Sequence, residues 1–158
     1  MKSFWKTIIW SCILSIIAAS AVDILISSRI PIIGKHIGLT YSLNPGIAWG
    51  IRLPRGIQEI LILAALALVT RMGVKSLKTP NPTPTPYPLP PTPTAYALII
   101  GGGIANVIDR LRDGYVTDFV QIGTFPIFNV ADSFVCIGVG MLLIEAVFPK
   151  ILAFQSRK

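Results

Sequence analysis

Four of the seven acidic residues in this chain of 158 fall in one stretch, Gly101 to Ser133. They are Asp109, Asp113, Asp118 and Asp132. The chain is 53% hydrophobic and only 13% charged, so carboxylates are scarce in it and costly to bury. Asp118 and Asp132 flank a short apolar segment that is typical of a hairpin. We interpret these two residues as an aspartic catalytic pair at a membrane surface.

An aspartate pair supplies everything that peptide hydrolysis needs in the absence of a metal, serine or cysteine. One carboxylate activates water as a base, and a protonated partner gives a proton to the leaving amine. Asn129 can cap a helix that begins next to it, so Asp132 would lie at the positive end of the helix dipole. We therefore expect Asp132 to ionise more easily and Asp118 to hold the shared proton, with the pair titrating as a unit.

Other hydrolytic chemistries lack their residues. The sequence contains no HExxH and no GxSxG, and its one histidine, His36, has no metal-ligand spacing around it, which indicates a solvated loop residue. Cys12 and Cys136 both lie in apolar segments, so we expect buried, inert thiols rather than a disulfide. Spacing alone also fits a small channel or proton-coupled carrier with the aspartates as relay groups.

Long apolar runs identify a membrane protein. The mean hydropathy is +0.69, and four runs are close to the roughly 20 residues that cross the hydrocarbon core. We expect a membrane all-α protein with four transmembrane helices: Phe4–Val22, Ile57–Gly73, Ala95–Leu111 and Val130–Phe148, the last closed by Pro149. The first run resembles a cleavable signal peptide at residues 19–21, but further spans follow, so we expect an uncleaved helix.

The segments between these runs predict a small extracytoplasmic β-element. Leu39, Tyr41 and Leu43 alternate with polar residues up to Asn44, which indicates a short strand. Val116–Ile122 is strand-like and leads into a reversal at Gly123-Thr124. Trp49 and Tyr41 are suited to the membrane interface.

Residues 79–94 hold eight of the thirteen prolines, which predicts an extended cytoplasmic linker of polyproline type within a single domain, 1–158. An SH3-type ligand is the alternative for this segment.

The charge distribution predicts the orientation. Four spans place both termini on one side, where eight basic residues lie against six on the other, so we expect cytoplasmic termini. Every acidic residue except Glu145 lies near the opposite face, and the chemistry is expected there. The net charge of +7 is explained by anionic lipid headgroups rather than by nucleic acid.

Polar residues at the end of the third span share one helical face. Asn106, Asp109 and Arg110 have the spacing i, i+3 and i+4, which fits a supporting hydrogen-bond network or a polar cap where the helix leaves the membrane. The turn at Asn44-Pro45-Gly46 gives Asn44 the chance to donate to a substrate backbone. Gly101–Gly103 would allow close helix packing or leave room for a substrate helix.

Two sequence stretches together resemble the bacterial lipoprotein signal peptidases, also called type II signal peptidases. GGGIANVIDRLRDGYVTDFV, followed by FPIFNVADS, is similar to the family's signature. Asn44–Gly50 resembles its N-x-G-x-A-[FW] motif, and four spans with an extracytoplasmic loop after the first also match. The resemblance covers nearly the whole chain.

The resemblance implies a membrane aspartic endopeptidase of the bacterial cytoplasmic (inner) membrane. It would cleave prolipoproteins just before a diacylglyceryl-modified cysteine, with no metal or cofactor. Asp118 and Asp132 match the catalytic aspartates. The matches to supporting or substrate-contacting residues are Asp23, Asn44, Gly46, Asn106, Asp109, Arg110 and Asn129. The implied partners are lipid-modified prolipoproteins and membrane lipids, and we expect a monomer.

Two features depart from the family pattern. The family follows the first-helix aspartate with a polar residue and, four positions on, a lysine; Ile24 and Ser27 stand here instead. We expect the missing support for Asp23 to come from elsewhere, with Arg29 as the candidate. The segment at residues 79–94 is expected to be an insertion into a short cytoplasmic connection. An inactive relative that binds lipoproteins is the alternative that these departures leave open.

Overall fold

The computed structural model describes residues 1–47, 51–54, 56–78 and 92–147, and the backbone alone of 148–155. Its helices are α1 (Lys2–Leu25), α2 (Ile57–Ser76), α3 (Thr92–Asp113) and α4 (Val130–Gln155). Its strands are β1 (Ile30–Ile33), β2 (Ile37–Asn44) and β3 (Val116–Ile122). The predictions for Trp49 and for residues 79–91 of the linker lie outside the described residues.

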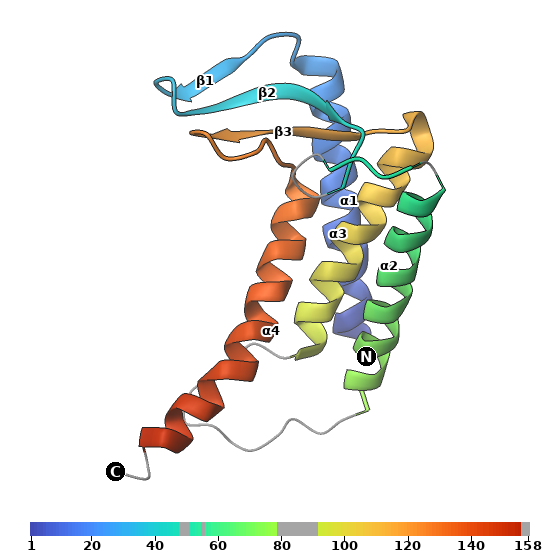
Figure 1. Ribbon diagram of the computed structural model, residues 1–158, viewed down its shortest axis with the longest axis vertical. Helices are drawn as coiled ribbons and strands as arrows, with labels where there is room; N and C mark the ends of the chain where they lie inside the picture. The colour runs from blue at the N-terminus through green and yellow to red at the C-terminus, as the bar shows by residue number, and fades with distance from the viewer. Residues whose placement is uncertain (48–50, 55, 79–91, 156–158) are drawn as a thin grey trace.

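The four helices form a bundle with α3 at its centre, in contact with α1, α2 and α4 (Figure 1). Glycines make this close packing possible. A Cβ on Gly101 would lie 1.9 Å from the Ser11 hydroxyl oxygen of α1, and one on Gly102 would lie 2.4 Å from the carbonyl oxygen of Ala131 of α4. Gly103 faces Leu66 of α2. Each glycine thus meets a different helix, which favours helix packing over the alternative of a space for a substrate helix.

Three of the helices in the described part of the chain are long and apolar enough to cross a membrane: α1, α2 and the segment Val130–Val147 of α4. A helix satisfies its own backbone hydrogen bonds, which is why such runs can cross lipid. This chain is therefore a multi-pass membrane protein. α3 is not among these three, because it is less apolar along its length and also carries four charged residues in its last two turns.

The three strands form an antiparallel sheet in the order β1-β2-β3. The sheet lies across one end of the bundle, and the start of α1 and the end of α4 both lie at the other end (Figure 1). β2 and β3 confirm the two predicted strands. β1 was not predicted because Pro31 interrupts it, but proline is tolerated on an edge strand, where no neighbour needs its missing N–H.

Proline also explains why two helix ends differ from those predicted from the sequence. α3 begins at Thr92 rather than Ala95 because Pro93 falls in the first turn, where backbone N–H groups have no helical partner. α4 does not stop at Pro149 as predicted but continues to Gln155. A proline inside a helix removes one hydrogen bond of the ladder, and the turns beyond it can still form.

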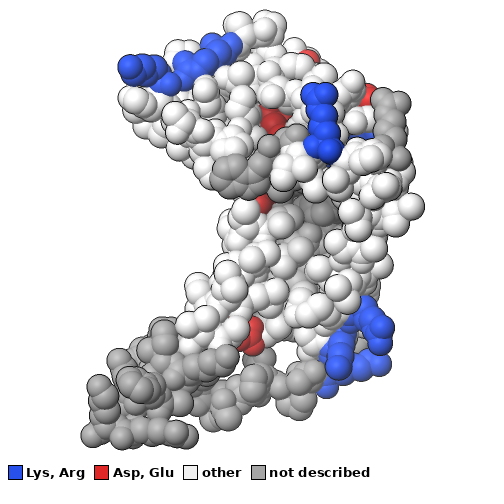
Figure 2. Space-filling view, in the orientation of Figure 1, with Lys and Arg blue, Asp and Glu red and all other residues white. Residues whose placement is uncertain are grey.

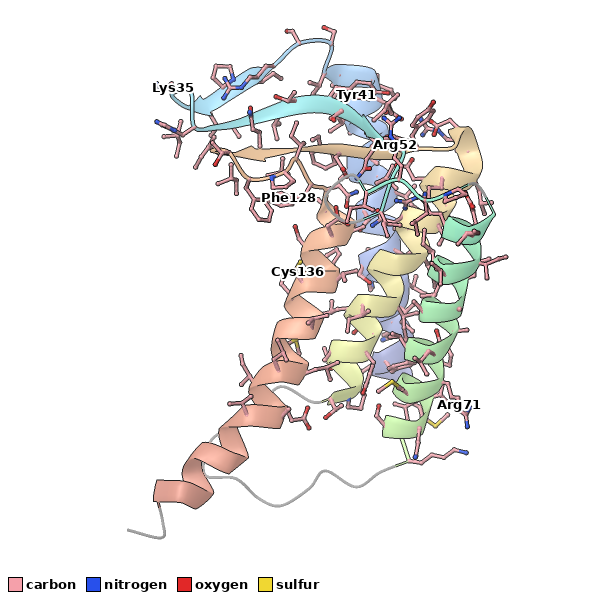
Figure 3. The ribbon with its side chains drawn as sticks, viewed as in Figure 1. Lys35, Tyr41, Arg52, Arg71, Phe128 and Cys136 are labelled. Atoms are coloured by element: carbon pink, nitrogen blue, oxygen red, sulfur yellow. The ribbon has the colours of Figure 1, made fainter. Side chains whose placement is uncertain are left out.

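Charged side chains gather at the two ends of the molecule, and the middle band is largely uncharged (Figure 2). Lys35 and Arg52 lie at the sheet end, whereas Arg71 lies at the opposite end (Figure 3). An uncharged band between two charged ends is the surface expected of a protein that crosses a bilayer.

Candidate active site

Asp118 lies in the middle of β3 and is only 3% exposed. Its carboxylate accepts two hydrogen bonds from asparagine side chains. Nδ2 of Asn44, at the end of β2, donates to Oδ2 over 2.9 Å, and Nδ2 of Asn129 donates to Oδ1 over 2.9 Å. The sheet register supports this contact, because Ser42 is opposite Asp118 and Asn44 is opposite Val116. Asp118 is thus buried but not left without partners.

The segment after β3 folds back as the sequence predicts. Gly123 has φ 56°, a left-handed conformation that suits glycine, and the backbone of Phe128 then pairs with that of Val120. Val120 N donates to the Phe128 carbonyl over 2.7 Å, and Phe128 N donates back over 3.1 Å. This closure brings Asn129 to Asp118, and α4 starts at the next residue.

Asp132 lies in the first turn of α4, where Asn129 caps the helix as predicted. The Asp132 backbone N–H donates to Oδ1 of Asn129 over 2.9 Å, and the Asn129 N–H donates to Oδ2 of Asp132 over 3.3 Å. Asn106 of α3 donates from Nδ2 to Oδ1 of Asp132 over 2.8 Å and accepts from Nδ2 of Asn129 over 3.1 Å. The two aspartates are therefore linked through Asn129 and Asn106.

The remaining predicted residues brace this network. Arg110 donates from Nη2 to the Gly46 carbonyl over 2.5 Å, which ties α3 to the turn after β2. The Gly46 N–H donates to Oδ1 of Asn44 over 2.9 Å, so the turn also orients the partner of Asp118. Asp109 accepts from the Thr117 backbone N–H over 2.6 Å. These contacts fit a supporting network rather than a polar cap facing solvent.

Asp23 stands apart from this cluster. It lies near the end of α1, where it pairs with Arg112 and accepts from the Thr117 hydroxyl over 3.4 Å. The expectation that Arg29 supports Asp23 is wrong, since Arg29 donates to Gln121 over 2.7 Å and to the Lys35 carbonyl over 3.0 Å. No local pattern in the sequence pairs Arg112 with Asp23, because 89 positions separate the two residues.

A cavity of about 500 Å³ opens at the two aspartates. Its polar end is formed by Asn44, Arg110, Asp118 and Asp132. The rest is mainly apolar, with walls from Ile127, Phe128, Val135, Cys136 and Ile137 among others. Figure 3 shows Phe128 below β3 and Cys136 farther along α4, and the molecule is hollowed below the sheet in Figure 2. The cavity joins a pair of carboxylates to a long apolar surface.

The expectation that both cysteines are buried is wrong. Cys136 is exposed on α4 and Cys12 is half-buried on α1, both as free thiols. An apolar neighbourhood in sequence does not distinguish a helix face toward the bundle from one toward lipid or a cavity. His36 is exposed, as predicted. The described residues contain no group of three or more metal-ligating side chains.

Burial raises the pKa of Asp118 to about 6. The charge of Asp132 acts in the same direction, whereas the hydrogen bonds from Asn44 and Asn129 and the charge of Arg110 oppose it. Asp118 is therefore half protonated at about pH 6, where an ordinary aspartate is almost fully ionised. A protonated carboxyl beside a second carboxylate can deliver one proton and accept another.

Comparison with known proteins assigns the family. A family model described as Signal peptidase (SPase) II matches residues 5–148. The chain belongs to the signal peptidase II family. It is an aspartic-type peptidase, a hydrolase of the signal peptidase II class.

Two curated relatives of this signal peptidase II chain support the assignment. The lipoprotein signal peptidase of Halothermothrix orenii is 36% identical over 119 residues, which cover 75% of this chain and 76% of the relative. That of Moorella thermoacetica is 32% identical over 123 residues, covering 78% and 77%.

The fold of this signal peptidase II is shared with a bacterial membrane enzyme solved by the in meso method at 2.3 Å resolution. That chain has a TM-score of 0.77 and 22% sequence identity, with 95% of this chain and 90% of that chain covered. A second bacterial membrane enzyme, solved at 1.9 Å, has a TM-score of 0.75 and 24% identity, with 92% and 93% covered.

Proposed function

We propose that this signal peptidase II cleaves the signal peptide from diacylglyceryl-modified prolipoproteins, on the N-terminal side of the lipidated cysteine. Family membership and the names of its relatives, which are lipoprotein signal peptidases, support prolipoproteins as substrates. The observation that carries the chemistry is that Asp118 and Asp132 line one cavity and are linked through Asn129 and Asn106.

Asp132 and Asp118 have different roles in this proposal. The Asp132 carboxylate removes a proton from a water molecule as the water oxygen attacks the scissile carbonyl carbon, and protonated Asp118 gives its proton to the carbonyl oxygen. Asp132 then passes its proton to the leaving amine, Asp118 takes back the hydroxyl proton as the carbonyl re-forms, and the peptide bond breaks. The buried position of Asp118 favours its protonated form at the start.

The other polar residues hold this geometry. Asn44 and Asn129 orient the two oxygens of Asp118, and Asn106 orients Asp132. Arg110 binds the carbonyl of Gly46, in the turn that orients Asn44. Asp109 binds the backbone N–H of Thr117, the residue before Asp118. A misplacement of about 1 Å can cost about 100-fold in rate, so bracing of this kind is a substantial part of catalysis.

The apolar part of the cavity suits the lipid of the substrate. Burial of acyl chain contributes about 0.8 kcal/mol per methylene, which would anchor the substrate with its scissile bond beside the carboxylates. The cavity walls, from residues 125–128 and the first two turns of α4, supply that surface.

The membrane arrangement follows from the same geometry. We infer that α3 is a fourth span, enclosed by α1, α2 and α4, and that its polar end lies at the surface with the sheet. The sheet and both aspartates then lie on the extracytoplasmic face of the bacterial cytoplasmic membrane, and both termini lie in the cytoplasm. The protein is proposed to act as a monomeric single domain among membrane lipids, without a cofactor.

Processing of a purified precursor tests this function. Purified protein in detergent is given one prolipoprotein in two forms, with and without the diacylglyceryl group on its cysteine. We expect cleavage of the lipidated form directly before the modified cysteine, identified by mass spectrometry, and little cleavage of the other. Equal cleavage of both forms would contradict the lipid requirement. No cleavage of either would contradict the proposed activity and favour a binding factor or carrier.

A further inference from the structure

Arg112 forms an ion pair with Asp23 that joins the ends of two helices. Nη2 of Arg112, in the last turn of α3, contacts Oδ2 of Asp23, near the end of α1. The Arg112 side chain is 50% exposed and that of Asp23 is 15% exposed. Neither residue lines the cavity at the two aspartates. Their contact therefore acts on the site only through other residues.

Asp23 places its other carboxylate oxygen against β3. Oδ1 accepts from the Thr117 hydroxyl over 3.4 Å, and the Thr117 backbone N–H donates to Asp109 over 2.6 Å. Thr117 is only 1% exposed, and Asp118 is the next residue along the strand. The residue before the candidate acid is thus held by carboxylates from two different helices.

We propose that Arg112 is a positioning residue for Asp118, acting through Asp23 and Thr117. By holding Oδ2 of Asp23, the guanidinium keeps Oδ1 directed at the Thr117 hydroxyl. Without this cation the Asp23 carboxylate keeps its hydrogen bond with Tyr41 of β2 but loses the partner that fixes Oδ2, so its contact with the Thr117 hydroxyl beside Asp118 is weakened. The inference rests on the proposed function, because positioning has meaning only for a chain that cleaves its substrate.

This role affects turnover more than stability. A half-exposed ion pair contributes little to the free energy of unfolding. Catalysis, in contrast, responds steeply to small displacements of a reacting group. Removal of the Arg112 cation should therefore lower kcat while the protein stays folded and KM, which reflects contacts in the cavity, stays close to the wild-type value.

Arg29 offers a matched control. It is also an exposed arginine on the sheet side of the molecule, but it contacts Gln121 and the Lys35 carbonyl instead of Asp23. Arg29→Gln removes the same charge without touching the contact to Asp23. Arg112→Lys is the conservative variant, because a single ammonium can replace the single-nitrogen contact made by Nη2.

The test measures kcat, KM and thermal unfolding for cleavage of a lipidated precursor in detergent. Arg112→Gln is expected to lower kcat about 10-fold, with KM within about 2-fold and unfolding unchanged. Arg112→Lys should stay within about 3-fold of wild type, and Arg29→Gln within about 2-fold. Wild-type kcat in Arg112→Gln, or an equal loss in Arg29→Gln, would overturn the inference.

Thr117→Val tests the same contact from the other side and remains informative if Arg112→Gln folds poorly. It keeps the backbone N–H that Asp109 binds but removes the hydroxyl, so we expect the same kcat loss. Because both changes act through one contact, the double variant should be no worse than the worse single variant. Additive losses would contradict the inference. If wild-type protein cleaves no precursor, the proposed function fails; if wild type and Arg112→Gln cleave equally, only the positioning role fails.

Discussion

Nδ2 of Asn129 donates to Oδ1 of Asp118 over 2.9 Å, from a residue that also caps α4. Asn129 is 4% exposed, so its amide is satisfied almost entirely inside the protein. One side chain therefore joins the buried carboxylate on β3 to the helix that carries Asp132. This is the closest physical connection between the two parts of the proposed dyad, and two substitutions can separate its roles.

Asn129→Ser should keep the N-cap of α4 and lose the hydrogen bond to Asp118. Serine is a good N-cap residue but cannot reach Asp118 with an amide, so we expect turnover about 10- to 100-fold lower. Asn129→Ala removes the cap as well, and it should also lower the free energy of unfolding by about 1–2 kcal/mol. Paired measurements of kcat and thermal unfolding check this. A serine variant with wild-type turnover would show that the Asp118 contact is dispensable.

The raised pKa of Asp118, to about 6, predicts the direction of the pH dependence. The mechanism needs Asp118 protonated, and the protonated fraction falls as pH rises through its pKa. We therefore expect kcat to decline above about pH 6, approaching 10-fold per pH unit. Asn44→Ala removes a donor that stabilises the ionised form, so it should move this decline to higher pH. A flat profile from pH 5 to 8, or a shift to lower pH, would contradict the assignment.

The close contact of α3 with α4 predicts different effects at neighbouring glycines. A Cβ on Gly102 would lie 2.4 Å from the Ala131 carbonyl oxygen, directly before Asp132. Gly102→Ala should therefore displace the start of α4, lower turnover and cost about 1–3 kcal/mol of stability. Gly103→Ala is the matched control, since its Cβ would meet only the flexible end of Leu66, at 3.1 Å. Equal losses of turnover and stability at both positions would argue against a specific requirement for close α3–α4 contact at Gly102.

The cavity wall predicts an effect on substrate binding. Cys136 lines the cavity on α4, whereas Val139 lies on the same helix, exposed and outside the cavity wall. Cys136→Trp should narrow the apolar part and raise KM about 10-fold for the lipidated precursor, while Val139→Trp leaves it within about 2-fold. The measurement is initial rate against precursor concentration in detergent. If both tryptophans have the same KM, the apolar wall does not contact substrate.

Local patterns in the sequence were sufficient to predict much of the candidate active site. Asn129 was predicted as the cap of α4 because capping depends on neighbours three residues apart, and the hydrogen bonds confirm it. A reversal was predicted at Gly123-Thr124, and Gly123 has φ 56°, a left-handed conformation that suits glycine. Helical spacing predicted that Asn106, Asp109 and Arg110 share one face, with a supporting network and a polar cap as the two alternatives.

Features that depend on distant partners were not predictable in the same way. β1 forms despite Pro31 because β2 supplies its hydrogen bonds, and no local pattern contains that information. Arg112 rather than Arg29 meets Asp23 because the packing of α1 on α3 decides which cation is near. Cys136 looks buried by composition, yet it is exposed because its face of α4 lines the cavity.

Substitution of single carboxyl groups tests the central claim most directly. Asp118→Asn and Asp132→Asn each remove one member of the proposed dyad. Asp113→Asn removes a nearby exposed aspartate that accepts from the Tyr115 N–H and lies 3.6 Å from Nη2 of Arg112, and it leaves the Arg112–Asp23 contact in place. Cleavage of the lipidated precursor is measured for all three in detergent, with thermal unfolding as the control for folding. We predict that turnover falls at least about 100-fold in the first two variants and stays within about 2-fold in the third. Wild-type turnover in both Asp118→Asn and Asp132→Asn would contradict the aspartic dyad.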